Sequence, residues 1–479
     1  MFAARLVVTG ELQVLTPLHL GTGEVESYKS IPQDPESKEP VSTTVATVMR
    51  DVDGLPVIPG ASVKGVLRAL VGNHDAADAL FGAPTGAEQL FQGRLTAHAT
   101  RYASSDPATL AHGLPFADRQ MPDGVELKAR GLFIAARTAI DPGSGTAEEG
   151  KLFHQEMVAP GARFALRLVL RLEPDGSGGE AEDCLIRVLE ALTRDDGVAF
   201  GKGQSLGQGR LRLDLGSLEA ERLTLDEASG TLRDSAAGAT TKELKQAIEA
   251  VESAPAERLF ARHELRLTCD GPFLIDDTSV KPPRKSEKPR LNAQQRGGRP
   301  LLSGSTVIGA LRARAGWLAK LRWNEDCKRH DERGRILAKG DEAARLADPE
   351  RVVTDPGKLS PTERLFGVTG WRGLVRVANI TCTSCAGFED ITSVKLDRFS
   401  MAPIDGALFT TRAAIDPVFD VVLEVEKRGG FPDDDDWELF TKLLDDLRDE
   451  GLMLGHGTSR GYGWFGVELV QLKAEGTTE

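Results

Sequence analysis

The feature that most constrains the fold of this chain is an internal repeat that covers most of its length. Three separate blocks of residues in the first half return, in the same order, in the second half. The matched pairs are 55–72 with 299–316, 140–153 with 396–409, and 201–209 with 455–463. Because the blocks keep their order over so long a period, they indicate duplication of a whole domain and exclude a solenoid of short repeats. We therefore expect two related domains in tandem.

Length and charge limit the other possibilities. The chain has 479 residues, enough for two or three domains that each bury a core. No apolar run reaches the roughly 20 residues of a membrane-spanning helix, and five cysteines without an export signal favour a reducing cytoplasm. The formal net charge is −13, whereas general electrostatic binding of nucleic acid usually requires a basic domain. Any nucleic-acid surface on this chain must therefore be local.

Each half shows the same succession of strands and helices. An alternating strand at 5–21 precedes an amphipathic helix that we expect Ser62 to cap, then further strands, a helix at 181–194 and a last strand. The second half restarts with a strand at 261–275 and a helix at 304–320. This pattern predicts an α+β fold of two tandem ferredoxin-like domains with long loop insertions. We place the domains at 1–218 and 259–475, a connecting segment at 219–258 and a charged insertion at about 321–359.

Two glycine-rich hairpins, GKGQSLGQG (201–209) and GHGTSRGYG (455–463), match in all four glycines and in the central serine. Glycine lets backbone approach another backbone or a phosphate closely, and the exposed amides can bind an anion. Cationic donors for a phosphate are Lys202 and Arg210 in the first hairpin and His456 and Arg460 in the second. The alternative is a tight hairpin whose glycines serve only its backbone conformation.

The two helix openings, PGASVKG (59–65) and SGSTVIG (303–309), also favour an anion, because free amides at a helix N-terminus attract phosphate. Hydroxyl and cationic side chains at or near these openings add possible contacts. They are Ser62, Lys64, Arg68, Ser305, Thr306, Arg312 and Arg314. The alternative is a simple capping motif without a ligand.

Four residues of the second half have zinc-ligand chemistry. Cys327 and His330 form one C-x-x-H pair, and Cys382 and Cys385 form one C-x-x-C pair. In a reducing compartment such pairs are typical of structural zinc, so we predict one bound Zn²⁺. The alternative is two unlinked pairs, because about fifty residues separate them. The other two cysteines lie in apolar periodic segments and are expected in the core.

Several of these motifs together resemble one known family. The segments IPGASVKGVLR (58–68), LFG (80–82) and AIDPGSGTAEEGKLFHQE (139–156), with the glycine-rich hairpins, resemble the RAMP superfamily. Within it they are most similar to backbone subunits of type III CRISPR effector complexes. The resemblance covers both halves, although Ile308 stands where the first helix opening has its lysine. It implies RRM-like domains, each with a thumb hairpin, at 141–153 and 397–409.

The resemblance also implies a function. Such subunits line up along a CRISPR guide RNA, each holding a short stretch through its backbone, and the thumb kinks the duplex with the complementary target RNA. The expected partners are therefore guide RNA, target RNA and other subunits, without a membrane. His154, on the thumb, is a further candidate RNA contact. A double-domain chain is expected to cover two successive segments of the guide.

Members of this family cut target RNA with the help of a divalent metal and an aspartate in the loop after the first strand. Counting back from Arg50, that position holds Val45 here. Asp34 lies in the same loop and is a substitute candidate. In the second half Asp276 and Asp277 directly follow the first strand, and we favour Asp277 as the catalytic carboxylate. Mg²⁺ or Mn²⁺ is the expected cation, since hard cations prefer carboxylate oxygens.

Two alternatives stay open. A guide-processing endoribonuclease of the same superfamily would use a histidine as general base without a metal, and its candidates are His19 and His456. A catalytically silent scaffold would only hold RNA, and Val45 favours that interpretation for the first half. An Asx-type turn at the strand end would equally explain Asp276 and Asp277 without catalysis.

Overall fold

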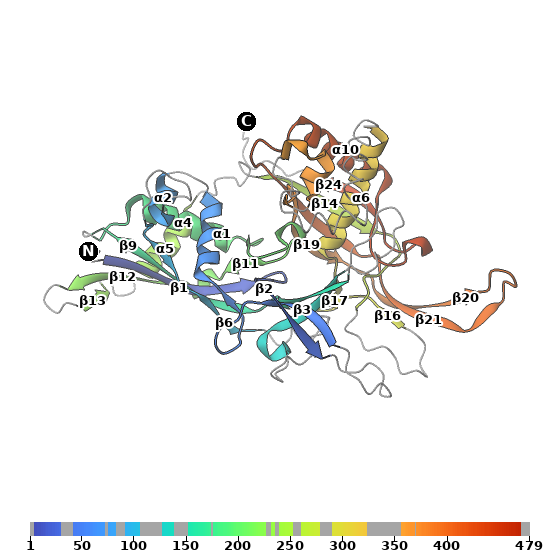
Figure 1. The fold of residues 1–479 in the computed structure, drawn as a ribbon, viewed down its shortest axis with the longest axis horizontal. Coiled ribbons are helices and arrows are strands. Elements are labelled where there is room, and N and C mark those ends of the chain that lie inside the picture. The colour runs from blue at the N-terminus through green and yellow to red at the C-terminus, as the bar shows by residue number, and fades with distance from the viewer. Residues whose placement is uncertain are drawn as a thin grey trace. The chain divides into compact units, whose positions relative to one another are not determined.

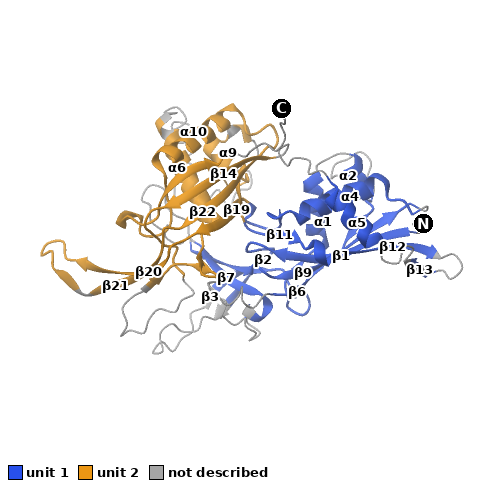
Figure 2. Ribbon diagram, turned by 180° about the vertical axis from the view of Figure 1, so that it is seen from behind, with its two compact units in different colours: residues 1–140, 147–204, 208–254 blue, residues 141–146, 205–207, 255–479 orange. Residues whose placement is uncertain are grey.

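The structure is a computed structural model of the whole chain. It describes residues 4–29, 42–71, 75–82, 92–105, 127–137, 152–173, 176–226, 231–234, 239–251, 260–277, 290–322, 356–368 and 370–470. These residues form two compact units (Figure 1, Figure 2). Unit 1 contains the described residues up to 251 except 205–207, and unit 2 contains 205–207 and those from 260 onward. The two halves of the repeat thus lie mainly in different units.

Unit 1 is built on a nine-stranded sheet with helices on one face. Its strands are β1 (Ala4–Val14), β4 (Val57–Ile58), β5 (Leu95–Ala97), β6 (Thr100–Ser104), β9 (Arg163–Leu172), β10 (Val198–Ala199), β11 (Arg210–Leu213), β12 (Glu219–Asp226) and β13 (Thr231–Asp234). Its helices are α1 (Gly60–Val71), α2 (Asp75–Phe81), α4 (Gly179–Thr193) and α5 (Ala239–Glu249).

The alternation of apolar residues along β1 and β9 explains this arrangement. Leu6, Val8 and Leu12 of β1 are buried with Leu166 and Leu168 of β9 in one core. The apolar stripes of the helices pack on that same face, because side chains alternate between the two faces of a strand. β1 lies between β11 and β9, and β9 pairs with β5 and β6. This is the strand order of a ferredoxin-like domain.

A second, four-stranded sheet of unit 1 has the order β2 (Gly21–Lys29), β3 (Ser42–Val48), β8 (Phe153–Val158) and β7 (Leu132–Arg137). Its buried polar contact joins Arg50 to Glu156, with the guanidinium 2.7 Å from a carboxylate whose side chain is 0% exposed. The same carboxylate accepts the backbone N–H of Val48 at 2.9 Å. Glu156 therefore ties the strand β8 to the end of β3.

Unit 2 repeats the main sheet in the order β19 (Val375–Ser384), β22 (Val418–Glu426), β14 (Phe260–Cys269), β24 (Trp464–Val470) and β23 (Leu452–Met453). Its helices are α6 (Gly304–Arg322), α9 (Pro361–Phe366) and α10 (Asp434–Glu450). β14 corresponds to β1, β22 to β9 and β24 to β11. The apolar faces of α6 and α10 pack on buried residues of β14 and β22. Both units are therefore α+β domains of one topology, as the sequence predicts.

The remaining strands of unit 2 include a long hairpin that extends from the body of the unit (Figure 1). These strands are β15 (Pro272–Phe273), β16 (Arg290–Asn292), β17 (Gln295–Arg296), β18 (Arg299–Pro300), β20 (Gly387–Leu396) and β21 (Pro403–Ile415). β20 and β21 form the hairpin, at the place of the expected second thumb. At its tip the carboxylate of Asp397 accepts the backbone N–H groups of Phe399 and Ser400 at 3.0 and 2.8 Å.

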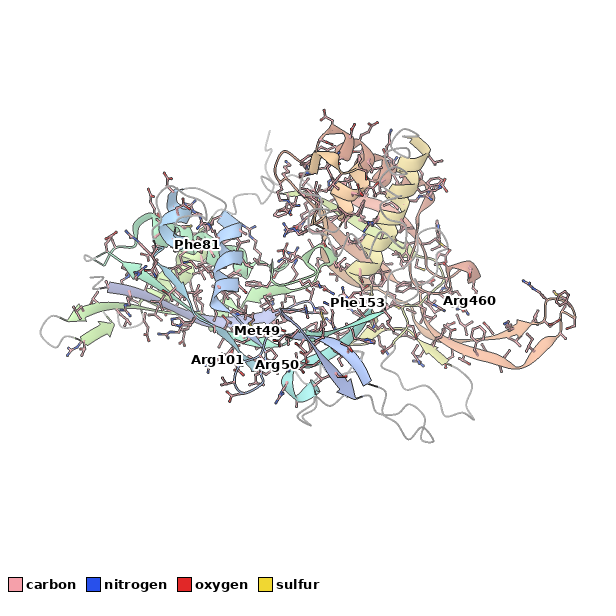
Figure 3. All side chains as sticks on the ribbon, in the orientation of Figure 1. Met49, Arg50, Phe81, Arg101, Phe153 and Arg460 are labelled. Carbon is pink, nitrogen blue, oxygen red and sulfur yellow. The ribbon has the colours of Figure 1, made fainter. Side chains whose placement is uncertain are left out.

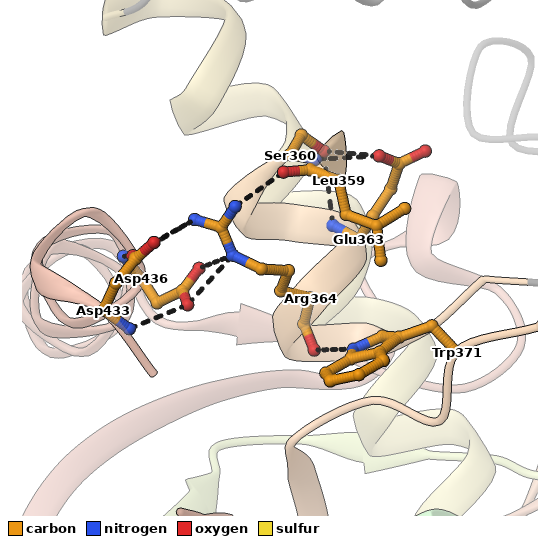
Figure 4. A network of polar contacts seen from close by, with 7 residues as sticks. All are labelled: Leu359, Ser360, Glu363, Arg364, Trp371, Asp433 and Asp436. Atoms are coloured by element: carbon orange, nitrogen blue, oxygen red, sulfur yellow. Dashed lines mark hydrogen bonds and ion pairs between the residues drawn. The ribbon is translucent and has the colours of Figure 1, made fainter. Parts of the chain in front are cut away.

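A buried polar network holds α9 against α10 (Figure 4). The guanidinium of Arg364 donates to Asp436 at 2.9 Å, to Asp433 at 3.1 Å and to the carbonyl oxygen of Leu359 at 2.6 Å. Trp371 donates its ring N–H to the carbonyl oxygen of Arg364 at 3.0 Å. Burial raises the pKa of Asp436 to about 6, although the charge of Arg364 acts in the opposite direction. A buried charge is tolerated here because it is paired.

Two details differ from the sequence predictions, and a third prediction cannot be compared with the structure. Ser62 does not cap its helix, since α1 already begins at Gly60 and Ser62 lies in its first turn. Residues 219–251, expected to connect the domains, form β12, β13 and α5, and β12 pairs with β1. Most of the charged insertion lies outside the described residues. No helix in the described part of the chain is long and apolar enough to cross a membrane.

Candidate functional site

The two glycine-rich hairpins have the same backbone structure. The N–H of Lys202 donates to the carbonyl oxygen of His19 at 2.9 Å, and the N–H of His456 donates to that of Leu274 at 2.7 Å. Further along, Gly209 and Gly463 each donate to the carbonyl oxygen of a proline, at 2.8 and 2.9 Å. Each hairpin therefore holds the segment that follows the first strand of its unit.

The glycines are required by this close approach. All four glycines of each hairpin have positive φ, between 68° and 86°. A Cβ on Gly209 would lie 1.9 Å from the carbonyl oxygen of Phe200, and a Cβ on Gly463 would lie 1.9 Å from that of Leu454. Backbone cannot move away from such a contact without breaking the hairpin. The glycine pattern thus has a structural cause in both units, and the side chains between the glycines carry any binding chemistry.

In unit 1 three basic groups gather at the hairpin. Lys202 is exposed on the hairpin, Arg137 ends β7, and His19 follows β1. Burial lowers the pKa of His19, and the charges of Lys202 and Arg137 lower it further, against the opposing effects of Glu156. Burial also lowers the pKa of the Arg137 guanidinium. Among the described residues no ion pair involves Arg137, and a partly desolvated cation of this kind favours an anion such as phosphate.

His19 itself serves the packing of unit 1. Its ring is 4% exposed, and Nδ1 is 2.8 Å from the carbonyl oxygen of Glu156. The matching hydrogen bonds place Leu274 at the equivalent position of unit 2, where it is 0% exposed. Since an apolar side chain fills the same place in the copy, the position does not demand a general base. This geometry disfavours His19 as the base of a guide-processing nuclease.

In unit 2 the hairpin presents an arginine between aromatic rings. The guanidinium of Arg460 lies 5.3 Å from the ring centre of Phe409 on β21 and 5.2 Å from that of Tyr462. Figure 3 labels Arg460 in unit 2, near the base of the hairpin formed by β20 and β21. Arg460 and His456 are both exposed. Arginine stacked on aromatic rings is a common surface for nucleic-acid backbone and bases, and here it needs the strand β21 as well as the hairpin.

The two aspartates after β14 lie in different environments. Asp276 is half-buried, and its carboxylate accepts the N–H of Asn292 at 3.2 Å. Burial raises the pKa of Asp276, while the N–H of Asn292 and the charge of His456 lower it. Asp277 is only 7% exposed. Asp276 is therefore the more accessible of the two carboxylates, whereas the sequence led us to favour Asp277 as the catalytic one.

The side chains around Asp276 supply only some of the ligands that a hard cation needs. Mg²⁺ and Mn²⁺ accept one or two carboxylates and complete their shells with water and substrate phosphate. Asp276 fits that role. Among the described residues, no three His, Cys, Asp or Glu side chains gather as a complete metal site. Asp34, the substitute candidate in the first half, lies outside the described residues.

The resemblance led us to expect an aspartate at the position of Val45, and neither that position nor its counterpart in unit 2 is a carboxylate. Val45 is 0% exposed in β3 and pairs in parallel with His154 of β8. In unit 2 Arg290 of β16 pairs in the same way with Thr410, the residue after the repeated Phe409. Arg290 is thus the counterpart of Val45. His154 is half-buried in β8.

Three of the predicted RNA-binding cations have other partners. Arg210 is 3% exposed and donates to the carbonyl oxygen of Gly197 at 3.0 Å, so it is not available to a ligand. Arg68 binds the carboxylate of Asp78 and the carbonyl oxygen of Gly82, which fastens α1 to α2. Arg314 makes two contacts with Asp446, at 2.6 and 2.8 Å, and fastens α6 to α10. These arginines stabilise the helices.

Other predicted residues of the helix openings stay accessible. Burial lowers the pKa of Lys64, and the charges of Arg68 and Arg171 lower it further, so this amine is held among like charges. Arg312 is exposed, and no ion pair involves it in the described part of unit 2. The hydroxyl of Ser303, at 2.9 and 2.8 Å from those of Ser305 and Thr306, accepts the N–H of Thr306 and caps α6. Lys64 and Arg312 therefore remain candidates for phosphate.

The structure describes two of the four side chains that we expect to bind zinc. The Cys382 thiol is 3.4 Å from the carbonyl oxygen of Ser384, and that of Cys385 is 3.3 Å from that of Gly387. Burial and the neighbouring thiol raise the pKa of Cys382, which favours the protonated form. Cys327 and His330 lie outside the described residues. Zinc binding by these four side chains stays a prediction.

Sequence reasoning missed the partners of the hairpin side chains. Arg137 and Phe409 come from thumb strands, and only the pairing of those strands brings them beside the hairpins. A signal was present for Phe409, which repeats Phe153 in the matched block, whereas Ser393 replaces Arg137 in unit 2 by strand register. No motif marks Arg137, because its role depends on a contact distant in sequence.

Comparison with known proteins agrees with this architecture. The RAMP superfamily model matches residues 11–212 and 266–466, one match for each unit. The chain therefore belongs to the RAMP superfamily and contains two of its domains in tandem. Among curated proteins it is similar to the CRISPR system Cms endoribonuclease Csm3 of Mycobacterium tuberculosis (strain ATCC 25618 / H37Rv). The two are 26% identical over 199 residues, which cover 41% of this chain and 77% of the relative.

Proposed function

We propose that this chain is a guide-RNA-binding backbone subunit of a type III CRISPR effector ribonucleoprotein that acts in antiviral defence. One observation carries the proposal: both RAMP domains present accessible basic side chains on the same glycine-rich hairpin, at the end of the first strand. The similarity to a CRISPR endoribonuclease supports CRISPR guide RNA as the ligand. The partners would be guide RNA, complementary target RNA and other subunits, in the cytoplasm.

The two units would hold RNA by different contacts. In unit 1, Lys202 and Arg137 would bind phosphate groups, since both are cationic and Arg137 is partly desolvated. In unit 2, Arg460 with Phe409 would contact backbone and a base face. Lys64 and Arg312 at the helix openings would add phosphate contacts. These are local basic sites, which reconciles RNA binding with a net charge of −13.

We further propose that Asp276 supports target-RNA cleavage within the assembled complex. The argument rests on accessibility, because Asp276 is the half-buried carboxylate after β14 and Asp277 is 7% exposed. A divalent cation at Asp276 would supply positive charge to the reacting phosphate. The carboxylate itself would orient that cation's water and accept hydrogen bonds from it. The counterparts in unit 1, Gly21 and Thr22, have no carboxylate, so cleavage would come from unit 2 alone.

The RNA-binding proposal is tested by purifying the tagged protein from its own host and sequencing the RNA that accompanies it. We expect short RNAs of uniform length that carry a repeat-derived end. Absence of RNA, or fragments of random sequence, would contradict the proposal.

The cleavage proposal is tested with Asp276→Ala in the assembled complex, using Asp270→Ala as the matched control because Asp270 is an exposed aspartate of the neighbouring turn. Cleavage of complementary RNA should fall at least about tenfold with Asp276→Ala and stay unchanged with the control. Removal of divalent cations by EDTA should have the effect of the variant. Unchanged cleavage by Asp276→Ala would remove this residue as a catalyst and leave the chain as a scaffold.

The zinc prediction has a separate test. Elemental analysis of the purified protein should find about one equivalent of zinc, which Cys382→Ser with Cys385→Ser should remove. A metal-free wild-type protein would contradict it.

A further inference from the structure

The main sheet of unit 1 has one face without helices, and this face carries an unusual set of side chains. Alternation along the strands turns Arg5 of β1 and Arg167 of β9 away from the core residues that precede and follow them. Arg101 of β6 lies directly opposite Ala165 of β9, on the same face. Figure 3 shows Arg101 on the side of the sheet away from the helices.

These three arginines lack the partners that arginines usually find. Arg5, Arg101 and Arg167 are all exposed, and none of them makes an ion pair within the described part of the chain. In register, Arg101 and Arg167 are diagonal neighbours on adjacent strands, which places their Cβ atoms about 7–8 Å apart. Thr9 of β1 lies opposite Arg167, whereas Arg5, four residues from Thr9 on β1, lies opposite Arg171. The three cations therefore form a diagonal row across the adjacent strands β6, β9 and β1.

Carboxylates do border this row. Glu219 and Glu221 of β12 lie opposite Thr9 and Val7 of β1, and neither forms an ion pair with the arginines in the described residues. Glu11 and Asp214 are already bound to Arg163, at 2.9 and 3.3 Å. The three arginines therefore keep their positive charge uncompensated in the described residues, although Glu219 and Glu221 lie in the same sheet.

On the same face of unit 2, arginines are paired with carboxylates. Arg266 of β14 and Asp420 of β22 lie directly opposite each other and make two contacts, at 2.9 and 3.0 Å. Arg376 of β19 and Glu424 of β22 are likewise directly opposite, at 2.7 Å. Arg262 is 3.6 Å from Glu264.

The contrast shows that the fold does not need uncompensated arginines at this place. Opposite charges across strands stabilise a sheet, and like charges without partners do not. In unit 2 the arginines named above have such partners, whereas in the described part of unit 1 Arg163 has them and Arg5, Arg101 and Arg167 do not. Unpaired arginines on a flat face fit an anionic ligand with repeated charges, because each guanidinium can bind one phosphate through two N–H groups.

We propose that the helix-free face of unit 1 is a second RNA-binding surface, at which Arg5, Arg101 and Arg167 bind successive parts of a single-stranded RNA backbone. The ligand class rests on the proposed function, but the surface is separate from the glycine-rich hairpins. An acidic protein would require apolar anchors at the centre of the contact. Val7 lies between Arg5 and Thr9 on this face, but it is only 6% exposed and offers no apolar anchor, so phosphate is the better fit.

The test compares two triple variants of the full-length protein with the wild type. Arg5→Gln, Arg101→Gln and Arg167→Gln remove the row. Arg187→Gln, Lys242→Gln and Lys427→Gln remove the same charge from other exposed positions that make no ion pair in the described residues. Each protein is titrated with a fluorescein-labelled single-stranded RNA of mixed sequence at several salt concentrations.

We expect the first triple variant to bind about tenfold more weakly or worse at low salt. Its slope of log K against log salt should fall by about 2, since each phosphate contact to a single strand contributes about 0.7. The control variant should keep the affinity and the slope of the wild type. Equal slopes for all three proteins would overturn the inference.

Two further outcomes separate this inference from the proposed function. If the first triple variant still co-purifies with uniform guide RNA and has an unchanged salt slope, the second surface is wrong and guide binding stands. If the wild type itself carries no RNA, the proposed function fails first. Loss of a protein subunit from the purified complex, with an unchanged salt slope, would make the face a protein interface and would also overturn the inference.

Discussion

The two glycine-rich hairpins have nearly the same backbone and different side chains between their glycines. In unit 1 the hairpin carries Lys202, whose charge acts on His19 as that of Arg137 does, and in unit 2 it carries Arg460 between two aromatic rings. The backbone cannot vary, because a Cβ at Gly209 or Gly463 would meet a carbonyl oxygen at 1.9 Å. The lesson is that duplication preserved the residues that the fold requires and let the ligand-facing residues diverge.

The segments held by these hairpins also carry different side chains in the two units. The matching hydrogen bonds align Gly21 and Thr22 of unit 1 with Asp276 and Asp277 of unit 2. The first unit therefore has no carboxylate at these two positions, whereas the second has a carboxylate at both beside its basic groups. We interpret unit 1 as the RNA-holding copy and unit 2 as the copy that can also support chemistry.

The largest effect should come from the buried ion pairs, which differ between the units. Arg364→Ala in unit 2 leaves Asp436 buried without its partner, and Arg50→Ala in unit 1 does the same to Glu156. Each variant should lose about 3–5 kcal/mol of unfolding free energy, the usual cost of an uncompensated buried charge. Urea denaturation measures this loss. A loss below about 1 kcal/mol in either unit would show that its pair does not hold the fold together.

The hairpins offer the next test, because the account requires them to be equivalent as backbone. Gly209→Ala and Gly463→Ala should each cost about 3 kcal/mol or more, through the close contact and the positive φ. Gly65→Ala and Gly309→Ala are matched controls, since both glycines are exposed in helices with nothing within 4 Å of the new Cβ. Those controls should stabilise by about 0.5–1 kcal/mol. A tolerated substitution in one hairpin alone would break the equivalence.

The binding chemistry should then separate the units. Lys202→Ala with Arg137→Ala should weaken RNA binding by about 1.5–3 kcal/mol and reduce its salt dependence. Phe409→Ala should weaken it by about 1–3 kcal/mol and leave the salt dependence unchanged, because a ring contributes stacking and no charge. Fluorescence titration at several salt concentrations distinguishes the two. If both variants changed the salt slope equally, the two sites would not differ as we infer.

The smallest effect concerns pH and a histidine that only unit 2 carries. His263 packs against Phe440 at 5.1 Å, its Nε2 is buried without a hydrogen bond, and Val8 holds the equivalent place in unit 1. Burial lowers the pKa of His263 from 6.5. The unfolded chain therefore takes up the proton first, so this contribution to stability is present above about pH 6.5 and is lost as pH falls.

His263→Val should remove that loss. Thermal unfolding between pH 7 and pH 5 should show a smaller decrease in Tm for the variant than for the wild type, with little difference at pH 7.5. An identical decrease in both proteins would mean that His263 is protonated as easily in the folded state as in the unfolded state.

Much of the fold could be predicted because it depends on local patterns. Alternation in β1 and β14, the apolar stripes of the helices and the repeated blocks indicated two tandem α+β domains. The candidate site could be predicted less well. Arg210 has the sequence context of a ligand-binding cation, but it is only 3% exposed and donates to the carbonyl oxygen of Gly197. Charge alone does not show which arginines support the structure.

The remaining features depend on contacts between distant segments. Arg137 reaches the first hairpin only because β7 pairs with β8, and Phe409 reaches Arg460 only because β21 runs beside the second hairpin. The relative exposure of Asp276 and Asp277 could not be predicted for a similar reason. Their relative exposure depends on the backbone pairing of Asp277 with Asn292, at 2.7 Å, which no local motif announces.

The most direct test of the central claim is a nuclease footprint of the RNA-loaded protein, compared between wild type, Lys202→Ala with Arg137→Ala, and Arg460→Ala with His456→Ala. The account states that each unit holds its own segment of RNA with its own side chains. It predicts that each double variant shortens the protected RNA, and that the two shorten it from different ends. Footprints of wild-type length in both variants would contradict the account.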